Sequence, residues 1–202
     1  LDMRHYDTIA HDQTYYEGYP WVGSDPYGVA ATNEISVMVY SGTPSDEKLM
    51  NDADAVQRPA VVVCEPQVYK DTDIMGVFSL PDRSTPLKAW LEDELDKAVD
   101  FYIKEVEQRH WYGLFNYGDV MHTYDYGRHC WKYDMGGYAW QNTELVPTLW
   151  LWYAFLRSGR GDIFDMAEAM SRHAADVDVY HIGDKKGIGS RHNVIHWGDP
   201  CK

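Results

Sequence analysis

Two separate stretches of this chain gather the residue types that could carry out acid–base chemistry on a bound ligand. The first runs from Trp111 to Trp140 and combines three Trp and six Tyr with two His and several charged residues. Neither a helical period of 3.6 nor a strand period of 2 organises it, so we expect irregular backbone bent at glycines. Aromatic faces mixed with hydrogen-bonding groups suit a polar, ring-shaped ligand such as a sugar. The alternative is an ordered loop whose rings only cover a core.

Within this first stretch, His122 and Tyr124 could transfer protons. An imidazole accepts a proton near neutral pH, and a phenol can donate one. Arg128 could bind a carboxylate through two parallel hydrogen bonds. The alternative is that His122 caps a bend and Arg128 pairs with Asp125. The same stretch offers further candidates for ligand contact, namely Asp119, Tyr133 and Trp140.

The second stretch surrounds Arg191 and His192. Asn193, His196 and Trp197 follow closely, so hydrogen-bond donors gather around an aromatic ring. Two histidines four residues apart would share a helix face, as in a zinc site, but Asn193 stands where such a motif has glutamate and nearby glycines indicate a loop. We therefore predict sugar contact or proton transfer here, and no metal site.

Composition restricts the class of partner. The formal net charge is −14, and no run of basic residues exceeds two, so a nucleic-acid partner is not expected. An acidic sugar polymer can still bind where a few Arg, Lys or His converge. The longest apolar run, 149–156, is too short to cross a bilayer, so no membrane partner is expected. Three cysteines without a C-x-x-C pair suggest neither a disulfide framework nor a zinc ribbon.

A long amphipathic helix is predicted to precede the first stretch. Pro86 marks its start, because the missing N–H of proline costs nothing at the first helical position. Apolar residues then recur at three- and four-residue steps through Arg109. Two acid-first pairs on its wet side have the spacing of helical ion pairs: Asp93 with Lys97, and Asp100 with Lys104.

A helical hairpin is predicted to follow the first stretch. Asn142 or Thr143 could cap a helix through Arg157, with Gly159 ending it. Its middle is apolar almost all round, as in the inner ring of a helical barrel. The short turn into a third helix, 162–177, indicates an antiparallel hairpin. Stacked hairpins of this kind suggest a toroid of paired helices.

The third predicted helix carries His173 on its buried stripe, where we expect a core histidine with its hydrogen bonds satisfied. Residues 1–80 differ in character: they predict a β- and loop-rich lead-in, with a strand over 34–40 and a short helix capped by Ser45. We therefore expect a mainly α fold, in which 81–202 form the helical-hairpin part of an incomplete (α/α) toroid.

Several longer motifs carry a family resemblance. They are GDVMHTYD (118–125), KYDMGGYAW (132–140), LWLWYAFLRSGRGDIFDMAEAM (149–170), and DVYHIG with GSRHNVIHWG (within 178–198). They resemble the central catalytic domain of exo-acting rhamnogalacturonan lyases, which is polysaccharide lyase family twenty-six and its bacterial relatives. Shorter similarities at 4–12 and 79–90 extend the match over essentially the whole chain. Members of that family are larger, with β-domains beside a helical toroid, so we expect this chain to be part of a longer polypeptide.

The resemblance implies β-elimination at a galacturonate, or a related uronate, linked to rhamnose in an acidic plant-type polysaccharide. It implies a secreted or periplasmic location and leaves a Ca²⁺ requirement open, with no other cofactor expected. It supplies no catalytic assignment for single residues. From residue types we assign the base to His122 or His192 and the proton donor to Tyr124. The remaining roles are carboxylate binding by Arg128 or Arg191 and sugar stacking by Trp140 and Trp197.

Two other functions remain open from the residues alone. A glycoside hydrolase on the same toroid could use Asp119 or Asp134 together with Glu144, since two carboxyl groups flank the bond that such enzymes cleave. A non-catalytic carbohydrate-binding protein would need the aromatic rings but not the histidines. An ultraviolet assay separates lyase from hydrolase, because only a lyase forms an unsaturated product.

Overall fold

The computed structural model describes residues 27–113, 116–133, 139–141, 146–184, 186–187, 189–191 and 194–195. Helices dominate this part of the chain, in the order α3 (Asp46–Gln57), α4 (Pro66–Asp71), α5 (Pro86–Arg109), α6 (Pro147–Ser158) and α7 (Gly161–Asp176). Two short antiparallel pairs complete it: β1 (Tyr124–Asp125) with β2 (Cys130–Trp131), and β3 (Ser190–Arg191) with β4 (Val194–Ile195). Among the described residues, no helix has the length and apolarity needed to cross a bilayer.

Helix α5 begins and ends where the sequence predicts. The Oγ1 atom of Thr85 accepts a hydrogen bond from the Lys88 N–H at 3.3 Å, and Pro86 occupies the first helical position. His110 ends the helix in the left-handed conformation, with φ of 54°. Several apolar side chains of α5 are exposed within this chain, and Val99 is its buried residue.

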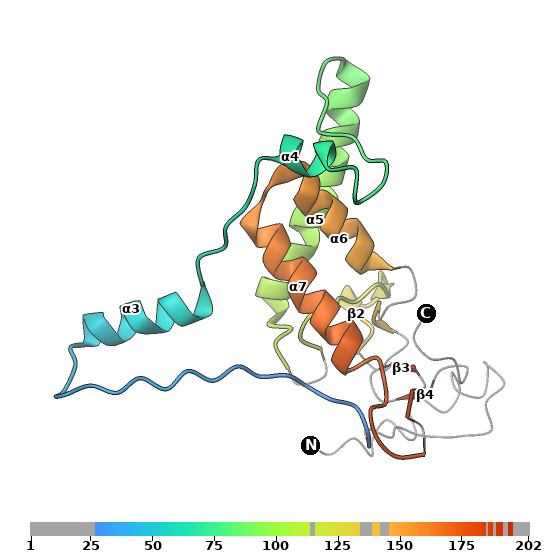
Figure 1. The fold of residues 1–202 in the computed structure, drawn as a ribbon. Coiled ribbons are helices and arrows are strands. Elements are labelled where there is room, and N and C mark those ends of the chain that lie inside the picture. Colours follow the sequence, from blue (N-terminus) through green and yellow to red (C-terminus); the bar gives the residue numbers. More distant parts are fainter. Residues whose placement is uncertain are drawn as a thin grey trace.

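Helices α6 and α7 form the predicted antiparallel hairpin and pack along their lengths (Figure 1). Gly159 ends α6 with φ of 67°, a conformation that glycine adopts without strain. Helix α6 begins at Pro147, later than predicted, because proline suits the first helical position and the preceding Val146 is left-handed. The predicted caps Asn142 and Thr143 lie outside the described residues.

Residues 34–40, which precede α3, do not form the predicted strand. Residues 34–40 are extended but unpaired within the described part of the chain, and Ile35 and Val39 are 85% and 92% exposed. A strand needs a neighbouring strand to satisfy its backbone groups, so the β-branched pattern alone does not produce one. Ser45 caps α3 as predicted. Figure 1 shows this segment and α3 extending away from the layer formed by α5, α6 and α7.

The aromatic stretch contributes its tryptophans to the core. Trp111, Trp131 and Trp140 are buried, and Trp111 meets the other two edge to face at ring-centroid distances of 5.8 and 5.3 Å. Tyrosines of the same stretch are exposed, among them Tyr126 and Tyr133. The burial of these indoles agrees with the interpretation that the stretch covers a core, and its role as a sugar site stays a prediction.

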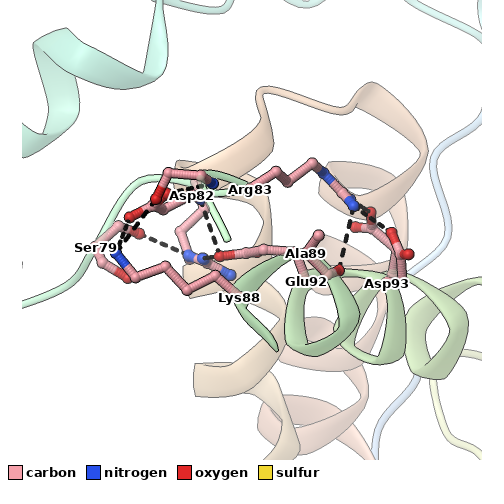
Figure 2. A network of polar contacts seen from close by, with 10 residues as sticks. Ser79, Asp82, Arg83, Lys88, Ala89, Glu92 and Asp93 are labelled. Carbon is pink, nitrogen blue, oxygen red and sulfur yellow. Dashed lines mark hydrogen bonds and ion pairs between the residues drawn. The ribbon is translucent and has the colours of Figure 1, made fainter. Parts of the chain in front are cut away.

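A network of ion pairs joins α5 to the loop before it and to the end of α6 (Figure 2). The predicted pairing of Asp93 with Lys97 is wrong, because Arg83 pairs with Asp93. Asp100 likewise pairs with Arg160, at 2.7 Å, rather than with a lysine on its own helix. An arginine from a neighbouring segment presents a planar group with five donors, which suits carboxylates on another helix.

A cavity of about 480 Å³ lies between α5, α6 and the start of α7, beside this network. Its lining includes Arg83, Arg157 and Arg160, and each of these arginines has a carboxylate partner. The cavity therefore has no uncompensated positive charge with which to attract an anion.

Candidate functional site

The first site segment, 116–123, is fixed by hydrogen bonds to residues 139–141. The His122 N–H donates to the Ala139 carbonyl at 2.9 Å, and the Gln141 N–H donates to the Val120 carbonyl at 2.8 Å. Met121 and Trp140 form an antiparallel bridge between these two hydrogen bonds. Because Met121 is fully buried and His122 is exposed, the segment anchors one side chain in the core and presents the next to solvent.

His122 and Tyr124 have different surroundings. The Nδ1 atom of His122 lies 2.9 Å from the Thr123 hydroxyl oxygen. The Tyr124 ring is half-buried and packs edge to face against Trp131 at 5.3 Å and Tyr126 at 5.4 Å. A proton-transferring role for either residue stays a prediction, and the geometry gives each a fixed backbone and access to solvent.

Arg128 lies in the turn between β1 and β2. Its backbone N–H and its Nε–H donate to the two carboxylate oxygens of Asp125, at 2.9 and 2.7 Å. These hydrogen bonds lower the pKa of Asp125 to about 2. The pairing matches the structural alternative considered for Arg128, in which its guanidinium closes the turn.

Two of the predicted substrate-binding residues are inside the core. Asp119 and Trp140 are 1% and 6% exposed, so a substrate in solvent does not reach them. Both side chains therefore belong to the packed interior of the described part of the chain. Tyr133 remains half-exposed, and its hydroxyl accepts a hydrogen bond from Trp111 Nε1 at 2.9 Å.

The second site segment follows α7. Val179 forms an antiparallel bridge with Gly189, and Arg191 belongs to β3. The other predicted residues of this segment lie outside the described part of the chain: His192, Asn193, His196 and Trp197. The carboxyl groups considered for a hydrolase, Asp134 and Glu144, lie outside it too.

His173 connects the two segments. Its Nε2 atom lies 3.3 Å from Asp178 Oδ1 and 3.5 Å from Asp119 Oδ2, and all three side chains are 1% exposed. Its Nδ1 atom lies 2.9 Å from the Tyr117 carbonyl oxygen. Burial disfavours the charged imidazole, but Asp178 and Asp119 outweigh that effect and raise the pKa of His173 to about 9.

The expectation that His173 is buried is confirmed, and its Nδ1 atom has a hydrogen-bond contact, whereas its two neighbouring carboxylates were not predicted. A close approach of the backbone brings Asp119 to it. Gly118 has φ of +86°, and a Cβ atom there would lie 2.1 Å from the Ala169 carbonyl oxygen of α7. Asp119 and His173 are more than fifty positions apart in the sequence, so local sequence patterns did not reveal this contact.

The cluster around His173 does not have the arrangement of a metal site. Among the described residues, no group of three or more His, Cys, Asp or Glu has the arrangement needed to bind a metal ion. His173 with its two aspartates forms instead a cluster in which two carboxylates surround a ring whose two nitrogens both face acceptors.

Comparison with known proteins gives the family. Residues 59–202 match the family model described as "PcRGLX-like protein C-terminal alpha/alpha toroid domain", and residues 1–54 match "PcRGLX-like protein central beta sandwich domain". The chain is 59% identical over all of its 202 residues to a Bacillus subtilis (strain 168) protein named "Uncharacterized protein YetA". It spans 24% of that protein's length.

These matches agree with the helical hairpin and confirm the predicted α/α toroid fold class. The two matched ranges meet between residues 54 and 59, and the division at residue 80 stays a prediction. The toroid model alone covers more than two thirds of the chain. The chain therefore belongs to the PcRGLX-like protein family, with most of its length in that family's C-terminal α/α toroid domain.

Proposed function

We propose that the full-length protein containing this chain is a polysaccharide lyase that cleaves rhamnogalacturonan-type polymers by β-elimination. The observation that carries the proposal is the meeting of Asp119 and Asp178 at His173. Through this cluster, the His122 segment and the Arg191 segment are both held at the C-terminal end of α7. Membership of the PcRGLX-like family is the second support, because it fits the rhamnogalacturonan-lyase resemblance of the motifs.

The reaction needs three groups around one uronate. A base removes the proton at C5, the electron pair forms the C4–C5 double bond, and the bond from C4 to O4 breaks as an acid protonates O4. A cation beside the carboxylate stabilises the negative charge that develops next to C5. His122 or His192 would act as the base, Tyr124 as the acid, and an arginine as the cation.

Two observations support one choice among these candidate residues. Arg128 already binds Asp125 through its backbone and its side chain, which favours Arg191 for the substrate carboxylate. Trp140 is buried, which favours Trp197 as the stacking ring, and Tyr133 is half-exposed. Substrate contacts by Asn193 and His196 remain part of the proposal.

The direct test is the absorbance of the unsaturated uronate when the full-length protein acts on rhamnogalacturonan oligosaccharides. Of His122→Ala and His192→Ala, the variant that removes the base should reduce the rate by roughly 10²-fold or more. Tyr124→Phe keeps the ring packed on Trp131 and should lower kcat by a similar factor. A matched control is His129→Asn: His129 is exposed in the same turn with φ of 53°, which asparagine tolerates.

Other outcomes would replace the proposal. Cleavage without an unsaturated product would indicate a glycoside hydrolase, although the burial of Asp119 argues against its part in one. Oligosaccharide binding without turnover, unaffected by the histidine substitutions, would indicate a carbohydrate-binding protein.

A further inference from the structure

His173 contacts each of the two site segments near the beginning of that segment. Asp119 is three residues before His122, and the β-bridge of Val179 with Gly189 directly follows Asp178. One imidazole in the last turn of α7 therefore lies between the segment that carries His122 and the segment that carries Arg191.

The contacts of the ring define its charge. A backbone carbonyl only accepts hydrogen bonds, so the Nδ1 atom must carry a proton to bind the Tyr117 oxygen 2.9 Å away. The Nε2 atom lies 3.3 Å from Asp178 and 3.5 Å from Asp119, and these carboxylates raise the pKa of His173 to about 9, which favours a proton on Nε2 as well near neutral pH. A ring with both nitrogens protonated is an imidazolium, which balances part of the charge of two carboxylates.

The first segment lies in close backbone contact with α7. The backbone of Gly118 lies so close to Ala169 and His173 that a Cβ atom would meet the helix at 2.1 and 2.9 Å. The carbonyl of Tyr117 and the carboxylate of Asp119 lie on either side of this contact and both approach the same ring. The position of the segment is therefore determined at three consecutive residues.

We propose that His173 is a positioning residue, whose imidazolium fixes the spacing between the His122 segment and the Arg191 segment and so aligns the groups that act on the uronate. This inference rests on the proposed function. His173 is too deeply buried to touch the substrate, so it acts through the segments. Groups that face the cluster in the described part of the chain include Asp119 from the first segment, Asp178 from the second, and Tyr102 of α5, which interacts with Asp119.

The experiment uses His173→Gln in the full-length protein, with hydrogen–deuterium exchange and steady-state kinetics on rhamnogalacturonan oligosaccharides. Exchange should increase in peptides covering both 116–124 and 178–191, and kcat should fall by roughly tenfold or more because small displacements of reacting groups cost rate steeply. The value of KM should change less than kcat, since His173 does not contact the substrate.

The matched control is Ser171→Ala, which alters the same helix on the side that faces α6. The hydroxyl of Ser171 accepts a hydrogen bond from Trp152 Nε1 at 2.9 Å and donates to the Ala167 carbonyl. This variant should leave exchange in both segments and kcat within about twofold of the wild type, because it removes no contact to either segment.

If His173→Gln does not fold, Asp178→Asn provides the test, because it preserves the shape of the side chain and removes one charge. It should increase hydrogen–deuterium exchange and lower kcat, as expected for His173→Gln. Three results would each overturn the positioning role. The first is a wild-type kcat in a folded His173→Gln variant, and the second is increased exchange in one segment only. The third is complete unfolding of both variants. Absence of lyase activity in the wild type would instead refute the proposed function, and the exchange result would still show whether His173 joins the two segments.

Discussion

Two clusters of charged side chains lie near opposite ends of α7. Near its start, Arg83 and Arg157 belong to a network with the acids of α5, and water reaches many of these groups (Figure 2). Near its end, His173 lies between Asp119 and Asp178, and all three side chains are 1% exposed. Hydration and side-chain entropy offset the attraction of an exposed pair, whereas a buried charge that loses its partner cannot regain water. Stability should depend strongly on the second cluster and weakly on the first.

The largest effect should come from His173→Leu, which removes the cation that lies between the buried carboxylates of Asp119 and Asp178. Breaking a buried ionic cluster costs about 3–5 kcal/mol of the free energy of unfolding. Urea unfolding followed by tryptophan fluorescence measures the loss, because Trp111 and Trp140 report on this part of the core. Adding Asp119→Asn and Asp178→Asn to the same variant should recover part of the loss. If His173→Leu alone were as stable as the wild type, the cluster would make no net contribution to the free energy of unfolding.

The second effect is a dependence of stability on pH between 6 and 10 that comes from His173. His173 has its pKa raised from 6.5 to about 9, so the folded state binds a proton more tightly than the unfolded state. Its contribution is fully present below pH 6.5 and is lost as the pH rises through 9. The difference amounts to about 3 kcal/mol at most. Melting temperatures between pH 6 and 10 should fall in the wild type, and His173→Leu should lack this component.

The elements around the buried cluster were largely predictable from the sequence, but the cluster was not. Thr85 and Pro86 marked the start of α5, and Gly159 marked the turn between α6 and α7, because caps and turns are local signals. The meeting of Asp119 with His173 depends on a contact between residues more than fifty positions apart. No local pattern contains it.

The same limit explains the ion pairs that were predicted incorrectly. The i,i+4 rule assigned Asp93 to Lys97, yet tertiary structure brings Arg83 to Asp93, and Lys97 pairs with Glu94 at 2.8 Å. The predicted strand at 34–40 failed for a related reason, since strand formation requires a partner that the pattern cannot supply. Burial was equally non-local: Trp140 and Tyr133 belong to one motif, but only the tyrosine is half-exposed.

The third effect concerns the most enclosed pair of the exposed network, Arg157 with Glu92. Their side chains are 17% and 13% exposed and lie 2.6 Å apart, and the Nε–H of Arg157 also donates to the Ser79 carbonyl. Arg157→Met should cost about 1–2 kcal/mol, between the values for exposed and buried pairs. Arg157→Lys should recover only part, because an ammonium group cannot make both contacts with the same geometry. A loss as large as that of His173→Leu would remove the contrast between the two clusters.

The smallest effect should come from Arg83→Gln at the rim of the network. Arg83 pairs with Asp93 and Asp96, but its side chain is 46% exposed and the two carboxylates are each 53% exposed, so water replaces the lost contacts. The urea midpoint should scarcely move in dilute buffer, and any shift should disappear at high salt, which screens exposed pairs. The loss in His173→Leu should persist at the same salt concentration, because ions do not reach a buried cluster. If Arg83→Gln and His173→Leu responded to salt alike, burial would not be the property that separates the two ends of α7.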